Sequence, residues 1–210
     1  MKYAVCMIIA IITLSHNGLA QRRSSKSKTR FGVKAGYNYV NSTNISSIAV
    51  DNTNGFHAGV FFSGEEDNVK AGSDFLFSKQ GYKYKNGKVY MNYLSTTETA
   101  DFFVVEDIFK LQIGLQIGYL LSAIADSSGI TFNTPSKKAT DYFTRFSFGI
   151  AGGAELISES GLSIGMRYTV GLNNLLKTYQ TNRPVPAFLP ALPNAILKSN
   201  IFQVYAGFRF

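Results

Sequence analysis

The sequence has little of the residue types that build disulfides, metal centres and many active sites. Of its 210 residues, one is a cysteine (Cys6), two are histidines and none is a tryptophan. Cys6 lies in an N-terminal apolar run, so the remainder of the chain can form no disulfide and no cysteine-based metal centre. We therefore expect no cofactor and no metal.

Long apolar runs are also missing, apart from the one at the N-terminus. Ala4–Leu14 follows Lys2 and precedes the small residues Gly18-Leu19-Ala20, which predicts a signal peptide over residues 1–20 that is cleaved on export. A retained anchor is the alternative, but eleven apolar residues are too few to span a bilayer of about 30 Å as a helix. No later stretch approaches the length of a transmembrane helix, so this chain can cross a membrane only as a closed β-barrel.

Acidic residues are absent from the segment that follows. Residues 21–30 (QRRSSKSKTR) hold five basic residues, and the whole chain has a formal charge of +8. The segment shows no apolar period and predicts a basic, disordered leader. Contact with anionic lipid headgroups or the cell wall is the alternative role. Aromatic residues are not interleaved with the basic ones, so nucleic acid is not an expected partner.

From Phe31 onward apolar residues recur at every second position, which is the pattern of a strand with one apolar face. The alternation is clearest in residues 110–119, 145–151, 162–172 and 202–210. Weaker strands are predicted over 31–40, 55–63, 69–84 and 88–104, with a β-bulge near Gln80-Gly81. The prediction is all-β: a closed antiparallel up-and-down transmembrane β-barrel of about eight strands, uncertain by one pair, over residues 31–210.

The connections between these strands fall into two classes. Residues 41–54, 123–141 and 173–199 form long polar connections, and all five prolines lie in the last two. Residues 64–67, 106–107 and 158–160 form short ones, and Asn86-Gly87 predicts a tight hairpin. Short turns at one end and long loops at the other are typical of outer-membrane barrels, whose long loops face outward.

Aromatic residues divide between the two predicted ends, as in the two interfacial girdles of a membrane barrel. The tyrosines expected near the outer rim are Tyr37, Tyr39, Tyr82, Tyr84, Tyr119 and Tyr142, and the phenylalanines expected near the inner rim are Phe31, Phe109, Phe208 and Phe210.

Several short motifs resemble the small outer-membrane β-barrel family common in Bacteroidetes, called porin-like or PorT-like. They are residues 31–36 (FGVKAG), 118–121 (GYLL), Arg167-Tyr168 and 171–173 (GLN). The terminal Phe210 resembles the signal that the barrel-assembly machinery recognises. The resemblance implies residence in the bacterial outer membrane, but no single activity. Tyr93-Leu94 departs from the family's Tyr-Leu-x-Ile-Pro pattern, so the register of the fourth strand stays open.

The sequence offers few residues for catalysis or for metal binding. His57 is the only histidine outside the predicted signal peptide, and its neighbours Phe56 and Ala58 belong to the lipid-facing row, so His57 points into the barrel. Gly59, not serine, follows on its own face, which argues against a Ser-His-acid site. Glu65-Glu66-Asp67 could bind calcium but is typical of a solvated turn. No catalytic, cofactor or metal site is predicted.

Charged residues on the inward face are the one chemical feature that remains. Alternation places eight of them inside the barrel: Lys34, Lys70, Asp74, Lys110, Arg145, Glu155, Arg167 and Arg209. A lumen of eight strands has room only for its own side chains, so these residues are candidates for ion pairs that plug the barrel, with Asp74 and Glu155 as the acids. A narrow anion path is the alternative.

These observations favour a non-enzymatic outer-membrane barrel whose long loops bind an unknown extracellular ligand or protein. A transport pore, a lipid-modifying enzyme and a soluble lipocalin-like binder are the alternatives. The last would require the apolar faces to point inward.

Overall fold

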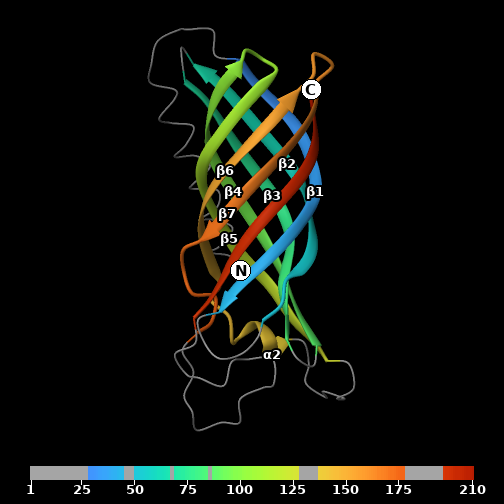
Figure 1. The fold of residues 1–210 in the computed structure, drawn as a ribbon, viewed down its shortest axis with the longest axis vertical. Helices are drawn as coiled ribbons and strands as arrows, with labels where there is room; N and C mark the ends of the chain where they lie inside the picture. Colours follow the sequence, from blue (N-terminus) through green and yellow to red (C-terminus); the bar gives the residue numbers. More distant parts are fainter. Residues whose placement is uncertain (1–27, 45–49, 67–68, 85–86, 128–136, 178–195) are drawn as a thin grey trace.

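The structure, a computed structural model, is a closed barrel of eight antiparallel strands (Figure 1). It describes residues 28–44, 50–66, 69–84, 87–127, 137–177 and 196–210. The strands are β1 (Lys28–Asn44), β2 (Thr53–Glu66), β3 (Val69–Tyr84), β4 (Gly87–Val105), β5 (Phe109–Ser127), β6 (Phe146–Ile157), β7 (Leu162–Gly171) and β8 (Leu197–Arg209). Each strand pairs with its sequence neighbour, and β8 pairs with β1 to close the wall. The fold class, including the count of eight strands, is confirmed.

In the membrane-crossing part of the wall, the regular apolar rows of β5 and β7 point away from the lumen. Leu115 and Ile164 are 62% and 56% exposed, whereas Arg167 and Gln116, which lie on the alternate row, are 2% and 6% exposed. Backbone donors and acceptors are satisfied between strands, so the apolar rows can lie against hydrocarbon without unpaired polar groups. This orientation excludes the lipocalin-like arrangement, in which the apolar rows would face inward.

The two ends of the barrel differ in their connections. At one end, which we call the inner end, β2 reaches Glu66 before β3 starts at Val69, and the β4–β5 and β6–β7 connections are also short. The other end, which we call the outer end, carries the long connections and the single-turn helix α2 (Lys137–Thr140). The C-terminus lies at the inner end (Figure 1). No helix in the described part of the chain is long and apolar enough to cross a membrane.

Several strands extend further than the sequence predicted. β1 begins at Lys28, inside the segment expected to be a disordered leader. β5 continues to Ser127 and β8 begins at Leu197, so both take residues from predicted loops. Strand ends made of polar or small residues lack the apolar alternation that marks the membrane segment. The prolines, the Asn86 hairpin position, most of the leader and all of residues 1–20 lie outside the described residues.

The β-bulge that the sequence predicts near Gln80-Gly81 is absent from the β3–β4 pairing. Every second residue from Asp74 to Tyr84 is buried, and the β3–β4 register runs through Gln80-Gly81 without a shift. The pairing of β3 is irregular only on the side of β2. The β2–β3 ladder ends at His57↔Ser78, and the isolated bridge Asp51↔Lys83 lies one residue out of the register of that ladder. The β4–β5 ladder, by contrast, shifts between Asn92 and Tyr93 and again between Phe103 and Val105.

The predicted outer girdle is also wrong in part. Tyr37 and Tyr39 are exposed on the outside of the wall, as expected, but Tyr82 and Tyr84 are buried. Both lie on the inward row of β3, and their large rings resemble an outward apolar row when the sequence is read alone. This ambiguity made the sequence pattern of β3 look as if the inward and outward rows exchanged near Gln80-Gly81, which led to the predicted β-bulge.

Candidate functional site: the barrel interior and its outer mouth

A chain of six charged side chains of alternating sign crosses the lumen. Its members, which we call the ionic layer, are Arg167, Asp74, Lys34, Glu155, Lys110 and Asp101. Consecutive members are joined by N–O distances of 2.6, 3.1, 3.9, 3.6 and 2.7 Å in that order. They come from β7, β3, β1, β6, β5 and β4, so the ion pairs tie six strands together across the interior.

Neutral side chains hold the ionic layer in place. Gln112 on β5 donates to Glu155 at 3.1 Å and accepts from Arg167 at 3.1 Å. The second bond joins β5 to β7, two strands that do not pair. The Tyr205 hydroxyl donates to Glu155 at 3.0 Å, and Lys34 Nζ lies 4.2 Å from the centre of the Tyr205 ring. Buried charges are costly unless they are paired and hydrogen-bonded, and here each acid has at least one cation and one further donor or cation within reach.

The eight charges predicted to lie inside the lumen do not all meet. Five of them (Lys34, Asp74, Lys110, Glu155 and Arg167) belong to the ionic layer. Lys70 lies over the Phe103 ring at 4.1 Å, and with Arg209 it lines a pocket of about 490 Å³, open mouth included, at the inner end. Arg145 lies at the outer end, where it donates to the Leu120 carbonyl.

Asp101 is the charge that sequence reasoning missed. It is 8% exposed and accepts from Lys110 at 2.7 Å and from Thr99 at 2.9 Å. With Asp101 included, the ionic layer holds three acids and three cations, so the excess of basic residues expected from the sequence is absent from it. The signal was available: Thr97, Thr99 and Asp101 form an alternating polar row in the fourth strand, whose register the sequence left open.

His57 belongs to a neutral layer on the outer side of the charges. It is 1% exposed, and its Nδ1 lies 2.7 Å from Asn38 Oδ1, which also accepts from Gln203 at 3.0 Å. Asn38 in turn donates to Ser78 at 3.0 Å. The imidazole therefore contacts amides rather than a carboxylate, which is the arrangement of a packed, hydrogen-bonded side chain and not of a general base held by an acid.

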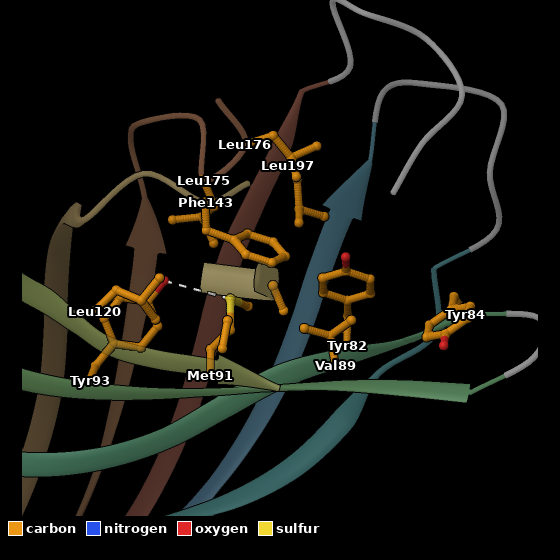
Figure 2. Close-up of a cluster of buried hydrophobic side chains, with 12 residues drawn as sticks. Tyr82, Tyr84, Val89, Met91, Tyr93, Leu120, Phe143, Leu175, Leu176 and Leu197 are labelled. Atoms are coloured by element: carbon orange, nitrogen blue, oxygen red, sulfur yellow. Dashed lines mark hydrogen bonds between the residues drawn. The ribbon is translucent and has the colours of Figure 1, made fainter. Parts of the chain in front are cut away.

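The outer mouth of the lumen is filled by apolar side chains. This outer cap consists of Tyr82, Tyr84, Val89, Met91, Tyr93, Leu120, Ala123, Ala139, Phe143, Leu175, Leu176 and Leu197. In Figure 2 Tyr82, Met91 and Leu120 lie with Phe143 and Leu175 around the short helix, and Tyr84 lies to one side of them. Phe143 and Val89 are fully buried, so water is excluded from the centre of the cap.

Hydrogen bonds fix the long connections onto the outer cap. The Thr140 hydroxyl on α2 accepts from the Ala123 backbone at 3.0 Å. Leu175 donates to the Leu197 carbonyl at 2.9 Å, and Thr144 donates to the Leu175 carbonyl at 2.8 Å. The β5–β6 and β7–β8 connections are thereby held against the mouth of the barrel.

The sequence matches the family model of the outer membrane protein beta-barrel domain over residues 19–177, a span that includes β1 through β7. The chain belongs to this family. It is accordingly a bacterial outer-membrane protein whose strands cross the membrane. The match does not distinguish the porin-like or PorT-like branch, which stays a prediction.

Solved structures of other small outer-membrane proteins are similar in fold. Neisserial surface protein A shares 12% identity at a TM-score of 0.48, with 89% of this chain and 100% of that chain covered. Ail of Yersinia pestis shares 13% identity at a TM-score of 0.48, with 87% of this chain and 99% of that chain covered. Outer membrane protein W of E. coli shares 20% identity at a TM-score of 0.45, with 89% of this chain and 100% of that chain covered. No curated protein matches the sequence.

Between the ionic layer and the outer cap, the barrel of this family member contains a small polar pocket of about 350 Å³, its open side included. Gln116 Oε1, Thr169 Oγ1 and Ser199 Oγ line it and make no hydrogen bond within the described residues. These groups make the pocket polar enough to hold water. The interior therefore has an ionic inner level, a neutral polar middle level and an apolar outer level.

Among the described residues, no group of three or more acidic, histidine or cysteine side chains is arranged to hold a metal ion. Glu65 and Glu66 lie at the inner end of β2, where the sequence placed a solvated turn, and Asp67 lies outside the described residues. The terminal Phe210 is 71% exposed and stacks on Phe31 at the inner rim, with ring centres 5.7 Å apart.

Proposed function

We propose that this protein is a non-enzymatic outer-membrane barrel whose outer face, built on the long connections, binds an anionic extracellular ligand or partner. The observation that carries the proposal is the closed interior. The ionic layer crosses the lumen, and the outer cap fills its mouth with side chains that include residues from both of the longest connections. A plugged, rigid barrel is a suitable base for a binding surface and a poor path for solutes.

The charge at the outer end supports an anionic partner. Lys88 and Lys177 are exposed there, and Lys83 and Lys198 are half-buried. The long connections add Lys137, Lys138 and Arg183 in the sequence. The described acids at this end are Asp51, Asp126 and Asp141, so basic residues are in excess and would attract an anion from solution.

A binding assay tests this proposal directly. The full protein in zwitterionic nanodiscs should bind immobilised sulfated polysaccharide but not neutral dextran, and the binding should weaken as salt is raised. The double variant Lys88→Glu/Lys177→Glu should lose most of this binding, whereas the matched reversal Arg30→Glu at the inner end should not. Equal retention on dextran, or equal loss in both variants, would refute an anionic ligand at the outer face.

Two further assays separate the alternatives. Planar bilayers containing the protein should show no single-channel steps, and regular steps would establish a pore. His57→Ala should leave lipid A unchanged in cells, because His57 contacts Asn38 and Gln203 inside the lumen rather than acyl chains outside it. Altered acylation of lipid A that depends on His57 would establish an enzyme.

The barrel-assembly machinery is the other partner we propose, through the exposed terminal ring of Phe210. Phe210→Ala should slow assembly into the membrane without changing the fold of the molecules that do assemble. Pulse-chase measurement of the rate at which the protein acquires its heat-modifiable form would show this.

A further inference from the structure

The inner mouth of the lumen contains a pocket that the ionic layer does not fill. This inner pocket has a volume of about 490 Å³, its open mouth included, and Asp101, Lys110 and Glu155 of the ionic layer line one part of it. Lys110 Nζ lies between the two acids, 2.7 Å from Asp101 and 3.6 Å from Glu155. The ionic layer as a whole holds three acids and three cations, so its charges are matched among themselves.

The rest of the inner pocket has more cations than acids. Arg30 and Arg209 line it, and Asp107 is the one acid that lines it outside the ionic layer among the described residues. Asp107 lies 3.6 Å from Arg30, but both side chains are partly exposed, so water weakens the attraction between them. Lys70 also lines the pocket, but it is already held over the Phe103 ring and is left out of this count.

Arg209 is the cation whose charge is not matched locally. In the part of the chain that the structure describes, its guanidinium forms no ion pair and no side-chain hydrogen bond. The strongest charge that acts on it is the positive charge of Arg30. The β1–β8 register places Arg209 opposite Gly32, so that Arg30 is the next inward-facing residue of β1. The Arg209 amide donates to the Gly161 carbonyl at 2.8 Å, which fixes the backbone that carries the guanidinium.

We propose that the inner pocket binds one oxyanion group, a phosphate or a carboxylate, through Arg209 and Arg30. A guanidinium donates two parallel N–H bonds to such a group, and two guanidiniums that share one exposed acid attract a further anion. The inner end carries the short connections, which face the periplasm in outer-membrane barrels, so the group belongs to a periplasmic molecule. One bound group adds little to the multivalent binding proposed for the outer face, and neither proposal depends on the other.

Arginine side-chain NMR of the full protein in zwitterionic nanodiscs tests the site. Titration with inorganic phosphate, and separately with acetate, at constant ionic strength should move the Nε–Hε signals of Arg209 and Arg30 along one saturating curve. Arg145, at the outer end, is the matched control, and its signal should need at least about tenfold more anion. Saturation by either oxyanion supports the site, and the arm with the tighter curve identifies the preferred group. An equal response to chloride would overturn the proposal.

Variants then show whether Arg209 itself holds the anion. Arg209→Gln should weaken the response of Arg30 about tenfold, because it removes a charged donor, whereas Arg145→Gln should leave that response within about twofold. The double variant Lys88→Glu/Lys177→Glu should not change it, which separates this site from the outer face. The heat-modifiable gel shift of each variant establishes that it is folded. A wild-type titration without saturation, an equal response at Arg145, or a curve that Arg209→Gln leaves unchanged would each overturn the proposal.

Discussion

The inner and outer halves of the lumen are filled by opposite kinds of chemistry. The inner half is held by ion pairs in which Asp74 joins Lys34 to Arg167, and the outer half by apolar contacts centred on Phe143. In the ionic layer the side chains must match in sign and distance, so a single loss leaves a charge without its partner. In the outer cap the contacts are non-directional, so a loss leaves only a cavity.

Removing one acid should therefore have the largest effect. Asp74→Ala leaves Lys34 and Arg167 with one acid fewer between them in a buried site, and should lower the free energy of unfolding by about 3–5 kcal/mol. Urea titration of the gel-shifted form measures the loss. Asp126→Ala, at an exposed acid of the outer end, is the control and should change little. A loss no greater than that of the control would show that the ionic layer does not stabilise the barrel.

A cavity in the outer cap should cost somewhat less free energy, and it should destabilise the outer cap rather than the whole barrel. Phe143→Ala removes a fully buried ring that packs near Tyr82, and should lower the free energy needed to open the outer cap by about 3 kcal/mol. Because Phe143 lies outside the strands, we expect faster proteolysis of the long connections with an almost unchanged unfolding transition of the barrel. If instead the whole transition shifted as far as for Asp74→Ala, the two halves would form one cooperative unit.

Crowding at the border of the ionic layer should have an intermediate effect. A side chain added at Gly165 would overlap the ring and hydroxyl of Tyr205, the residue that donates to Glu155. Because of this overpacking, Gly165→Val should lower the free energy of unfolding by about 1–3 kcal/mol. The companion change Tyr205→Phe, which keeps the ring, should lose only the hydrogen bond. If Gly165→Val were neutral in the same urea titration, Tyr205 would not be fixed in place.

The smallest effect is expected at the exposed rim. Arg30 and Asp107 are 3.6 Å apart at the inner end, with side chains 29% and 55% exposed. Asp107→Asn should cost under about 1 kcal/mol, because water screens the pair. Asparagine also tolerates the φ of 57° at this turn position, so the change isolates the charge. A loss comparable to that of Asp74→Ala would contradict the contrast between buried and exposed pairs.

Much of the wall could be predicted from alternation, because neighbouring residues of a strand point to opposite faces whatever the rest of the chain does. This rule placed Leu115 and Ile164 outside and Arg167 inside, and it gave the bounds of β3. It failed at Tyr82, because a large side chain on the inward row of the outer end carries the same local signal as a lipid-facing one.

Sequence alone thus determined that the chain forms a membrane barrel, which side chains of the most regular strands face lipid, and which end carries the long connections, since these depend on local period and on turn length. Only the tertiary structure decided that Asp101 completes the ionic layer, that Tyr82 and Phe143 meet in the outer cap, and that Arg30 and Arg209 line one pocket at the inner mouth. Those contacts join residues of different elements, and they depend on the register of each strand pair and on the curvature of the closed barrel. Alternation within a single strand contains no information about either.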